Sequence, residues 1–230
     1  MGSVPIFLEL VLFDLDHTLL DGDSDVEWLN FLIEEGAVDR TREEAANAEM
    51  ARRYKEGTAG TLEFVRFYMR TLALHPMERL VEWRSRYLAR SIRPRIPDAA
   101  RALVAEHQRN GALVAIITAT NRFLTELTAL DLAVDHLIAT EPAMRDGRFT
   151  GEVLGTPCFR EGKVTRLEEW LAARRAKLAD FAVSRFYSDS INDAPLLERV
   201  THPVAVNPDA RLERLAAERN WPILRLRLQP

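Results

Sequence analysis

The chain alternates between short apolar runs and longer stretches in which apolar residues recur every three or four positions. The runs have the length of buried strands, whereas the spaced pattern is typical of helices with one buried face. We therefore expect strands at 6–13, 113–117, 136–139, 185–187 and 203–206, and an edge strand at 222–226. The helical pattern covers 98–110, 122–130 and 163–176.

This alternation of strand and helix predicts an α/β fold, with a mostly parallel sheet covered by helices on both faces. Gly111 follows the helix expected at 98–110, where a C-terminal cap belongs. The segment "MRDGRFTGEV" at 144–153 has the pattern of a hairpin, with Asp146-Gly147 at its turn.

Residues 22–92 interrupt the alternation with a long, charged and helical pattern, which begins with "DVEWLNFLIEEG" at 25–36. This block is too long to be a connection between two strands. We interpret it as an all-helical cap inserted after the first strand, so that 1–21 and 93–230 form the core and "RPRIP" at 93–97 the hinge. The alternative is a peripheral helical bundle with no part in the chemistry.

Composition narrows the classes of function. The chain has 230 residues, of which 47% are hydrophobic, which suits one sizeable domain or a core domain that carries a smaller one. Its net charge of −4 argues against a nucleic-acid binder. Its single cysteine, Cys158, excludes an internal disulfide and is expected to be a packed thiol in a reducing environment. The N-terminal segment lacks a signal-peptide pattern and no apolar run approaches ~18 residues, so we expect a cytoplasmic protein that does not span a membrane.

Reactive side chains gather where the predicted strands end. In an open parallel sheet these ends meet at one edge, where ligands bind. A helix start at this edge also offers free N–H groups to an anion. The candidates are Asp14 and Asp16 after the first strand, Thr118, Thr120 and Asn121 after the second, Asp189, Asn192 and Asp193 after the fourth, and Lys163 at the start of a helix.

Carboxylates that crowd together raise one another's pKa unless a cation lies among them. A hard divalent ion with oxygen ligands meets this need, and Mg²⁺ is the usual one at phosphate sites. The lysine, the hydroxyls and the helix N–H groups suit a polyanion beside the metal. Together these groups are equipped for phosphoryl transfer by positioning and charge neutralisation.

The motifs "DLDHT" (14–18), "IITAT" (116–120), Lys163 and "SDSIND" (188–193) resemble the four motifs of the haloacid dehalogenase superfamily of phosphatases. The resemblance covers the core, and the helical block is similar in position to the cap of the phosphoserine-phosphatase-like branch. It implies a Rossmann-like three-layer core with an inserted helical cap that sets substrate specificity.

The resemblance also implies roles for the residues that match. Asp14 would be the nucleophile that forms an aspartyl-phosphate, and Asp16 would protonate the leaving alcohol and then activate water. Mg²⁺ would be held by the carboxylate of Asp14, the backbone carbonyl of Asp16 and the carboxylate of Asp189, with Asp193 near the metal.

Further roles follow for residues around the phosphate. Thr118 would hydrogen-bond the phosphoryl oxygens, Lys163 would balance their charge, and Asn192 would orient Lys163 or the substrate. The helix start at Thr120 and Asn121 would add donors for the phosphate.

Two departures from the family pattern remove no reacting group. Ser188 stands where many relatives have Gly, and Thr118-Ala119-Thr120 stands where some have Ser-Gly-Gly. The presence of Asp16 argues against the dehalogenases and the ion-pumping ATPases of the superfamily. A phosphomutase or phosphotransferase, and a non-catalytic phosphate-binding protein, remain as alternatives to a phosphatase.

The substrate is indicated by the entrance to the cap. Phosphoserine phosphatases carry a Glu nine residues after the nucleophile that helps to hold the substrate's ammonium group, and here that position is Asp23. Their cap arginine, which binds the substrate carboxylate, has no clear match, and Arg66 and Arg70 are the candidates. We expect a small, amine-bearing phosphomonoester, histidinol phosphate ahead of phosphoserine. The alternative for Asp23 is a helix N-cap.

The remaining candidates have structural interpretations. His17 alternates away from Asp14 and Asp16 in an extended chain, so we expect a packing or loop role for it. The cap aromatic residues follow helical spacing and are expected to form its core, with one or two of them lining the substrate pocket: Trp28, Phe31, Phe64, Phe67 and Trp83. Nothing in the sequence indicates an oligomeric state.

Overall fold

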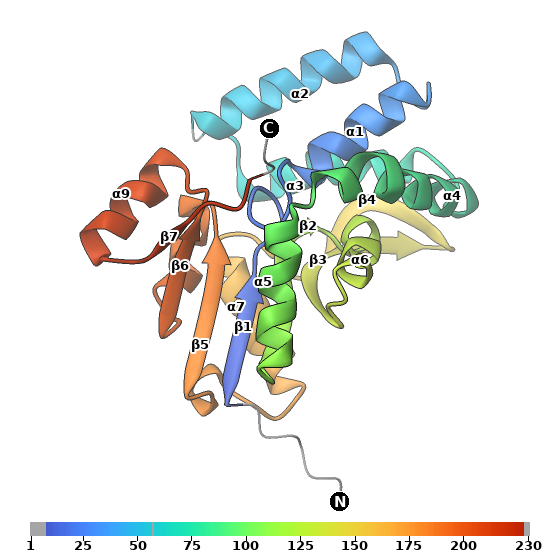
Figure 1. The fold of residues 1–230 in the computed structure, drawn as a ribbon. Helices are drawn as coiled ribbons and strands as arrows, with labels where there is room; N and C mark the ends of the chain where they lie inside the picture. Colours follow the sequence, from blue (N-terminus) through green and yellow to red (C-terminus); the bar gives the residue numbers. More distant parts are fainter. Residues whose placement is uncertain (1–7, 57, 228–230) are drawn as a thin grey trace, which may run out of the picture.

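The centre of the protein is a seven-stranded sheet. The computed structural model, which describes residues 8–56 and 58–227, gives the strand order β4-β3-β2-β1-β5-β6-β7 (Figure 1). Neighbouring strands are parallel except β3 and β4. The strands are β1 (Glu9–Phe13), β2 (Leu113–Asn121), β3 (His136–Arg145), β4 (Arg148–Leu154), β5 (Val183–Ser188), β6 (His202–Val206) and β7 (Ile223–Leu224).

The strands expected from the apolar runs all form, including the edge strand. Residues 6 and 7 of the first run lie outside the described residues. β3 runs on to Arg145 because it continues into the predicted hairpin with β4. The turn of that hairpin has Asp146 at φ 49° and Gly147 at φ 73°, which matches a type I′ turn.

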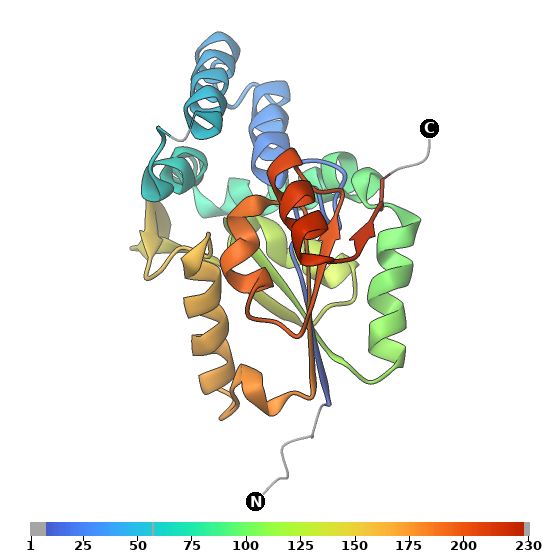
Figure 2. The same cartoon turned by 90° about the vertical axis from the view of Figure 1, so that its left-hand side faces the viewer.

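Helices cover both faces of the sheet. The faces alternate along β1, where Val11 and Phe13 belong to one buried cluster and Leu10 and Leu12 to the other. Figure 2 shows the sheet nearly edge on, with α5 and α7 on opposite sides. The core helices are α5 (Asp98–Arg109), α6 (Arg122–Asp131), α7 (Glu161–Ala172), α8 (Ala194–Leu197) and α9 (Ala210–Arg219).

One helix boundary was predicted wrongly. α7 ends at Ala172 rather than at 176, because the chain reverses just beyond it. Arg175 has a φ of 58°, and the N–H of Ala176 donates to the carbonyl of Leu171 at 3.0 Å. This is the left-handed ending common at helix C-termini, and it stops the helix although the local composition favours its continuation.

Four helices follow β1 and cover the edge of the sheet where the parallel strands end (Figure 1). They are α1 (Ser24–Glu34), α2 (Arg40–Lys55), α3 (Thr61–Ala73) and α4 (Met77–Tyr87), and we refer to them as the cap. A π-helical turn at Leu88–Ile92 and a 3₁₀ turn at Arg93–Arg95 return the chain to the core. The helical content expected of 22–92 is therefore present, whereas its limits as a separate domain remain a prediction.

The cap has an aromatic centre. The ring of Trp28 lies 5.6 Å from that of Phe31 and 5.2 Å from that of Tyr87. Buried polar groups at this centre are paired, since Trp28 Nε1 donates to Thr71 Oγ1 at 3.1 Å and Tyr87 Oη donates to the carbonyl of Ser24 at 2.6 Å. Trp28 and Phe31 are thus core residues, as their spacing predicts.

The β3–β4 hairpin lies against the cap rather than standing apart from it. Arg66 of α3 forms an ion pair with Glu152 of β4 at 2.6 Å. A Cβ at Gly151 would lie only 3.3 Å from the Cα of Arg70, so the absence of a side chain there lets the hairpin approach α3. The core therefore holds the cap through this hairpin as well as through the connections at its two ends.

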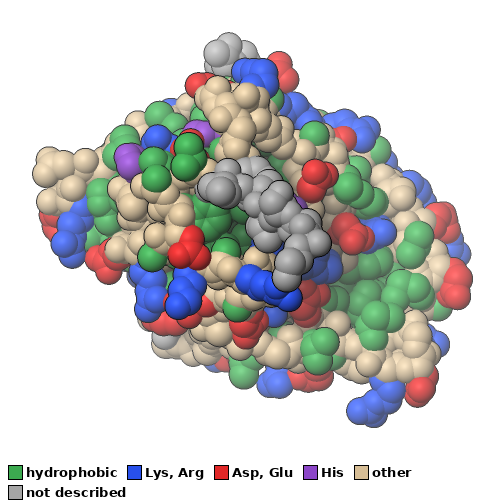
Figure 3. Space-filling view, turned by 90° about the horizontal axis from the view of Figure 1, so that it is seen from below, with side chains coloured by type: hydrophobic (Ala, Val, Ile, Leu, Met, Phe, Trp, Pro, Cys, Tyr) green, Lys and Arg blue, Asp and Glu red, His purple; other side chains and the backbone are tan. Residues whose placement is uncertain are grey.

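The face opposite the cap carries Lys and Arg side chains interspersed with Asp and Glu (Figure 3). Mixed charges of this kind fit the small net charge of the chain. None of the helices in the described residues combines the length and the apolar character needed to cross a bilayer.

We predict that Tyr87→Phe lowers the free energy of unfolding by about 0.5–1.5 kcal/mol, because the buried carbonyl of Ser24 loses the hydroxyl that donates to it. Urea unfolding followed by tryptophan fluorescence measures the change. The matched control is Tyr68→Phe, whose hydroxyl donates to Asn47 in a bond only partly shielded from water. An equal or larger loss of unfolding free energy in Tyr68→Phe would show that the buried Tyr87 hydrogen bond contributes no more to stability than the partly buried one.

Candidate active site

A cavity of about 280 Å³ lies between the cap and the carboxyl ends of the strands. The core contributes residues that follow β1 and β5, the last part of β2 and Lys163 of α7, and the cap contributes side chains from α1, α2 and α3. The charged lining residues include Asp14, Asp16, Asp23, Asp25, Lys163, Asp189, Asp193 and Arg211. Carboxylates thus outnumber cations around this space.

Lys163 joins two of the carboxylates. Its Nζ lies 2.7 Å from Asp14 Oδ1 and 2.6 Å from Asp193 Oδ2, and the lysine is 2% exposed. Asp193 also accepts a hydrogen bond from Ser188 Oγ at 2.6 Å, and Asp14 accepts one from Thr18 Oγ1 at 3.4 Å. Lys163, the third residue of α7, thereby links Asp14, which follows β1, to Asp193, which follows β5.

Burial and the neighbouring charges shift the pKa values of Asp14 and Lys163. Burial raises the pKa of Asp14 to about 7, although Lys163 opposes the shift. Burial alone would lower the pKa of Lys163, but Asp14 and Asp193 together hold it above its usual value. The lysine therefore stays charged, and one cation is shared between two buried carboxylates.

Asp16 is held from two sides. Its Oδ1 accepts the backbone N–H of Ser24 at 2.7 Å, and its Oδ2 accepts the hydroxyl of Thr120 at 2.9 Å. Ser24 Oγ in turn donates to Thr120 Oγ1 at 3.1 Å. Burial, and next the charge of Asp23, raise the pKa of Asp16 to about 6. Asp16 is thus oriented by the first residue of the cap and by the end of β2.

Two further carboxylates face the cavity at the start of α1. Asp23 is the N-cap of the helix, since its Oδ1 accepts the N–H of Val26 at 3.0 Å. Asp25 accepts from Thr120 Oγ1 at 3.3 Å. Burial is the main cause that raises the pKa of both, and Asp23 adds to the shift of Asp25. Among the described residues neither forms an ion pair with Lys or Arg.

Asp189 and Asp14 approach each other closely enough to interact. Burial raises the pKa of Asp189 well above its usual value, and Asp14 and then Asp193 raise it further. No side-chain donor in the described part of the chain hydrogen-bonds the Asp189 carboxylate, which receives only its own backbone N–H. No three His, Cys, Asp or Glu side chains of residues 8–56 and 58–227 form a ready-made metal cluster.

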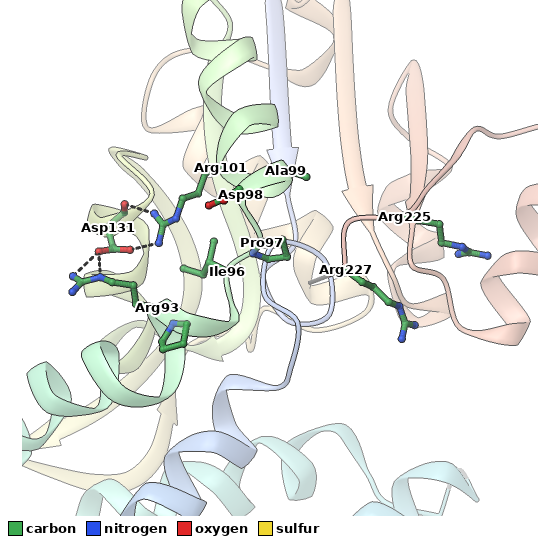
Figure 4. A pocket seen from close by; sticks show the side chains of 10 residues that line it. Arg93, Ile96, Pro97, Asp98, Ala99, Arg101, Asp131, Arg225 and Arg227 are labelled. Atoms are coloured by element: carbon green, nitrogen blue, oxygen red, sulfur yellow. Dashed lines mark hydrogen bonds and ion pairs between the residues drawn. The ribbon is translucent and has the colours of Figure 1, made fainter. Parts of the chain in front are cut away.

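A larger cavity of about 880 Å³ lies elsewhere, between the start of α5 and the C-terminal segment (Figure 4). Its arginines Arg93 and Arg101 are occupied by Asp131, at 2.7 and 2.6 Å. It contains none of the candidate residues from the strand ends, so the smaller cavity is the candidate active site.

Comparisons with known proteins agree with this geometry. Residues 11–198 match the family model of the haloacid dehalogenase-like hydrolases. The chain belongs to this family. A histidinol-phosphatase of Neisseria meningitidis serogroup C (strain 8013) is 42% identical over 216 residues, which cover 94% of this chain and 97% of that protein. The chain is a phosphatase of the haloacid dehalogenase type.

Two solved structures share its fold. A protein of unknown function from Bordetella pertussis Tohama I has a TM-score of 0.92 at 44% identity, covering 96% of this chain and 99% of that one. A substrate-bound phosphoserine phosphatase has a TM-score of 0.67 at 20% identity, covering 94% of this chain and 91% of that one. The expected α/β fold of the haloacid dehalogenase phosphatases is thereby confirmed.

Not every residue expected in the site of this phosphatase lines the cavity. Thr118 is fully buried and its Oγ1 accepts the N–H of Thr120 at 3.2 Å. Asn121 is the N-cap of α6, and its Oδ1 accepts the N–H of Leu124 at 3.1 Å. The oxygen of each side chain therefore accepts a local backbone N–H, and the roles expected for Thr118 and Asn121 at the phosphate remain predictions.

Asn192 lines the cavity without touching Lys163. Its amide donates to the hydroxyl of Tyr54 and to Ser190 Oγ, and Asp193 takes the place against the lysine. The two cap arginines considered for a substrate carboxylate also lie elsewhere: Arg66 pairs with Glu152, and Arg70 with Glu43 at 2.5 Å.

Several lining residues were not singled out from the sequence. They are Tyr54 of α2, Phe159 before α7, Asp209 and Arg211 around the start of α9, and Ser190. Tyr54 sits in a mostly polar helix, and Phe159 in a loop, so neither carries a local signal of site membership. Phe64, expected in the cap core or pocket, does line the cavity, and so does His17, whose φ of 56° fits the loop role expected for it.

We predict that Gly162→Ala displaces Lys163 from the carboxylates, because a Cβ at this position would lie 2.0 Å from the carbonyl oxygen of Pro157. Stability should fall by about 1–3 kcal/mol, as in overpacked cores, and phosphatase activity should fall with it. Gly60→Ala, where a Cβ meets nothing within 4 Å, is the control. Wild-type stability and activity in Gly162→Ala would refute the close approach.

Proposed function

We propose that the chain is a Mg²⁺-dependent phosphomonoester hydrolase that acts through an aspartyl-phosphate on Asp14. The observation that carries the proposal is the buried lysine that holds Asp14 and Asp193 together beside Asp16. Lys163 suits a phosphoryl group, because its positive charge reduces the repulsion between the negative phosphate and the nearby carboxylates.

In this proposal Asp14 attacks phosphorus. One of its oxygens is bound to Lys163, and among the described residues the other receives only a long side-chain hydrogen bond from Thr18 at 3.4 Å. The second oxygen thus remains the less committed one. An in-line attack by this oxygen would form the acyl phosphate and release the alcohol.

The residues present fit a magnesium ion. Asp14 is a buried carboxylate and Asp189 a half-buried one, the two repel each other, and Asp189 has no side-chain donor among the described residues. Two carboxylates with a backbone carbonyl, here that of Asp16, and remaining positions filled by water and phosphate form an oxygen set that Mg²⁺ accepts. When bound, the ion supplies positive charge against the phosphoryl oxygens.

Asp16 is the candidate general acid and base. Both of its oxygens accept hydrogen bonds, which fix the carboxyl group toward the cavity. Protonated, it can give its proton to the leaving alcohol oxygen, and the resulting carboxylate can then take a proton from the water that hydrolyses the acyl phosphate. The balance is one proton given and one recovered per turnover.

The preferred substrate in this proposal is a small amine-bearing phosphomonoester, with histidinol phosphate first. Asp23 and Asp25 face the cavity without a Lys or Arg partner in the described residues, so the charge of an ammonium group would find complementary carboxylates there. The 42% identity with a histidinol-phosphatase over nearly the whole of both chains supports the same substrate.

Phosphoserine is the second candidate, because its additional carboxylate requires a cation. The arginine that lines the cavity is Arg211, at the start of α9 in the core, whereas Arg66 and Arg70 of the cap are paired with glutamates outside it. The surroundings of Asp23 and Asp25 therefore favour an amino alcohol over an amino acid.

A leaving-group experiment tests the mechanism. With 4-nitrophenyl phosphate and Mg²⁺, Asp14→Asn should lower phosphate release by more than about 10³-fold. Asp16→Asn should retain a burst of one equivalent of nitrophenolate, since this leaving group needs no proton, while turnover of an alkyl phosphate falls by about 10²–10⁴-fold.

EDTA should abolish turnover, and added Mg²⁺ should restore it. Turnover of the Asp14→Asn variant at the wild-type rate would exclude Asp14 as the nucleophile. A requirement for a bisphosphate sugar primer, with little net phosphate release, would instead identify a phosphomutase, and an inert wild type would identify a phosphate-binding protein.

A substitution at the cap entrance tests the substrate. Asp23→Asn keeps an acceptor for the N-cap bond but removes the charge. We expect kcat/KM for histidinol phosphate to fall about tenfold, as for the loss of a charge-assisted hydrogen bond. An amine-free alkyl phosphate of similar size should lose less, because it is affected only by the lower pKa of Asp16 that follows when the charge of Asp23 is removed. Glu34→Gln, at the exposed end of the same helix, is the control. Equal losses of kcat/KM on both substrates would show that Asp23 does not bind the ammonium group of the substrate.

A further inference from the structure

Three aromatic rings form one wall of the cavity. Tyr54 comes from α2, Phe64 from α3, and Phe159 from the loop between β4 and α7. The centroids of Tyr54 and Phe64 lie 4.4 Å apart, and those of Phe64 and Phe159 lie 6.1 Å apart with planes inclined by 21°. These spacings are those of interacting aromatic pairs, so the three side chains act as one surface.

The wall is built from both sides of the cavity and is tied to the phosphate end. Asn192, which precedes the lysine-bound Asp193, donates its amide to the hydroxyl of Tyr54. Asn192 Oδ1 accepts from Arg160 Nε at 3.2 Å, and the Arg160 guanidinium lies 5.2 Å from the centre of the Phe159 ring. The distance between the rings and the reacting carboxylates is therefore fixed by hydrogen bonds rather than by apolar packing alone.

The rings retain a surface for a ligand. Tyr54 and Phe64 are only half-buried although they lie where the cap meets the core, and they line the cavity. Phe67, one turn farther along α3, does not line it and instead contacts Tyr68 and the guanidinium of Arg70. Of the two phenylalanines of α3, Phe64 therefore lines the cavity, and Phe67 packs against residues of its own helix.

The same cavity combines these rings with two carboxyl groups that have no Lys or Arg ion-pair partner among the described residues. Asp23 and Asp25 lie at the start of α1, and the cavity volume of about 280 Å³ admits only a small molecule. Aromatic faces and carboxylates together suit a group that is both flat and partly positive, because the ring quadrupole and the carboxylate attract the same charge. A flat heteroaromatic ring next to an ammonium group has this character.

We propose that Tyr54, Phe64 and Phe159 form a ring-recognition site that selects amino-alcohol phosphates carrying a flat heteroaromatic ring over those without one. The proposal rests on the proposed phosphomonoester hydrolase function, and it adds the residues that set specificity. The Tyr54–Asn192 hydrogen bond positions this wall, so that a bound ring and a bound phosphate are held at a set separation.

The test compares histidinol phosphate with O-phosphoethanolamine, which has the amine but no ring. Wild type should prefer histidinol phosphate. Phe64→Leu and Phe159→Leu should each lower kcat/KM for histidinol phosphate by about tenfold, the upper end of aromatic pair energies, and leave phosphoethanolamine within about twofold. Phe67→Leu, a matched change on the same helix, should keep the wild-type preference.

Product inhibition gives an independent readout that a purely structural role would not move. Histidinol should inhibit Phe64→Leu more weakly than wild type by the same factor of about ten, while inhibition by inorganic phosphate stays unchanged. Tyr54→Phe keeps the ring and loses the hydroxyl, so it should bind histidinol as wild type does but show a lower kcat on histidinol phosphate. Phe64→Leu is the fallback if Phe159→Leu fails to fold, since Phe64 is the more exposed of the two.

Equal losses on both substrates in Phe64→Leu, or unchanged histidinol inhibition, would overturn the ring site while leaving the phosphatase proposal intact. A wild type that hydrolyses phosphoethanolamine as well as histidinol phosphate would overturn it too. Failure of the hydrolase proposal is distinct, because wild type would then release no phosphate from either compound.

Discussion

The site depends on one buried lysine between two buried carboxylates. Removing charges from water is costly, and such a cluster persists only if its partners meet in good geometry. Lys163 meets that condition because α7, the end of β1 and the turn after β5 converge on its Nζ. The arrangement of parallel strands side by side brings these distant segments together, so the cluster depends on the fold.

Around that cluster the cavity has two ends of different character. At the core end, Lys163 and Asp14 are buried, and the carboxylates that could share a metal follow strands of the sheet. At the cap end, the half-buried rings of Tyr54 and Phe64 come from helices, and Asp23 and Asp25 have no Lys or Arg partner among the described residues. Conserving the first end while altering the second would change the substrate without changing the reaction, which is the division expected when chemistry lies on a scaffold and specificity on an insertion.

Sequence reasoning reached the parts of the protein whose signals are local. The strands, the inserted helices and the order Asp14, Asp16, Lys163, Asp189 could be predicted because each lies in a short pattern with its own period or motif. Thr118 and Asn121 lie at the end of β2 but are not among the lining residues of the cavity, because burial and helix capping depend on the exact backbone path. Tyr54 and Phe159 could not be found, since 105 positions separate them and only tertiary packing makes them neighbours.

The contact between Ser24 and Asp16 has a consequence for how selectivity is expressed. Ser24 is the first residue of α1, yet its N–H orients the carboxyl group of Asp16, the proposed general acid. A molecule too bulky for α1 to settle in place would therefore meet a misaligned acid even if its phosphate were bound. Discrimination against such molecules would be seen in the maximal rate more than in the strength of binding, because recognition and proton transfer share a single peptide group.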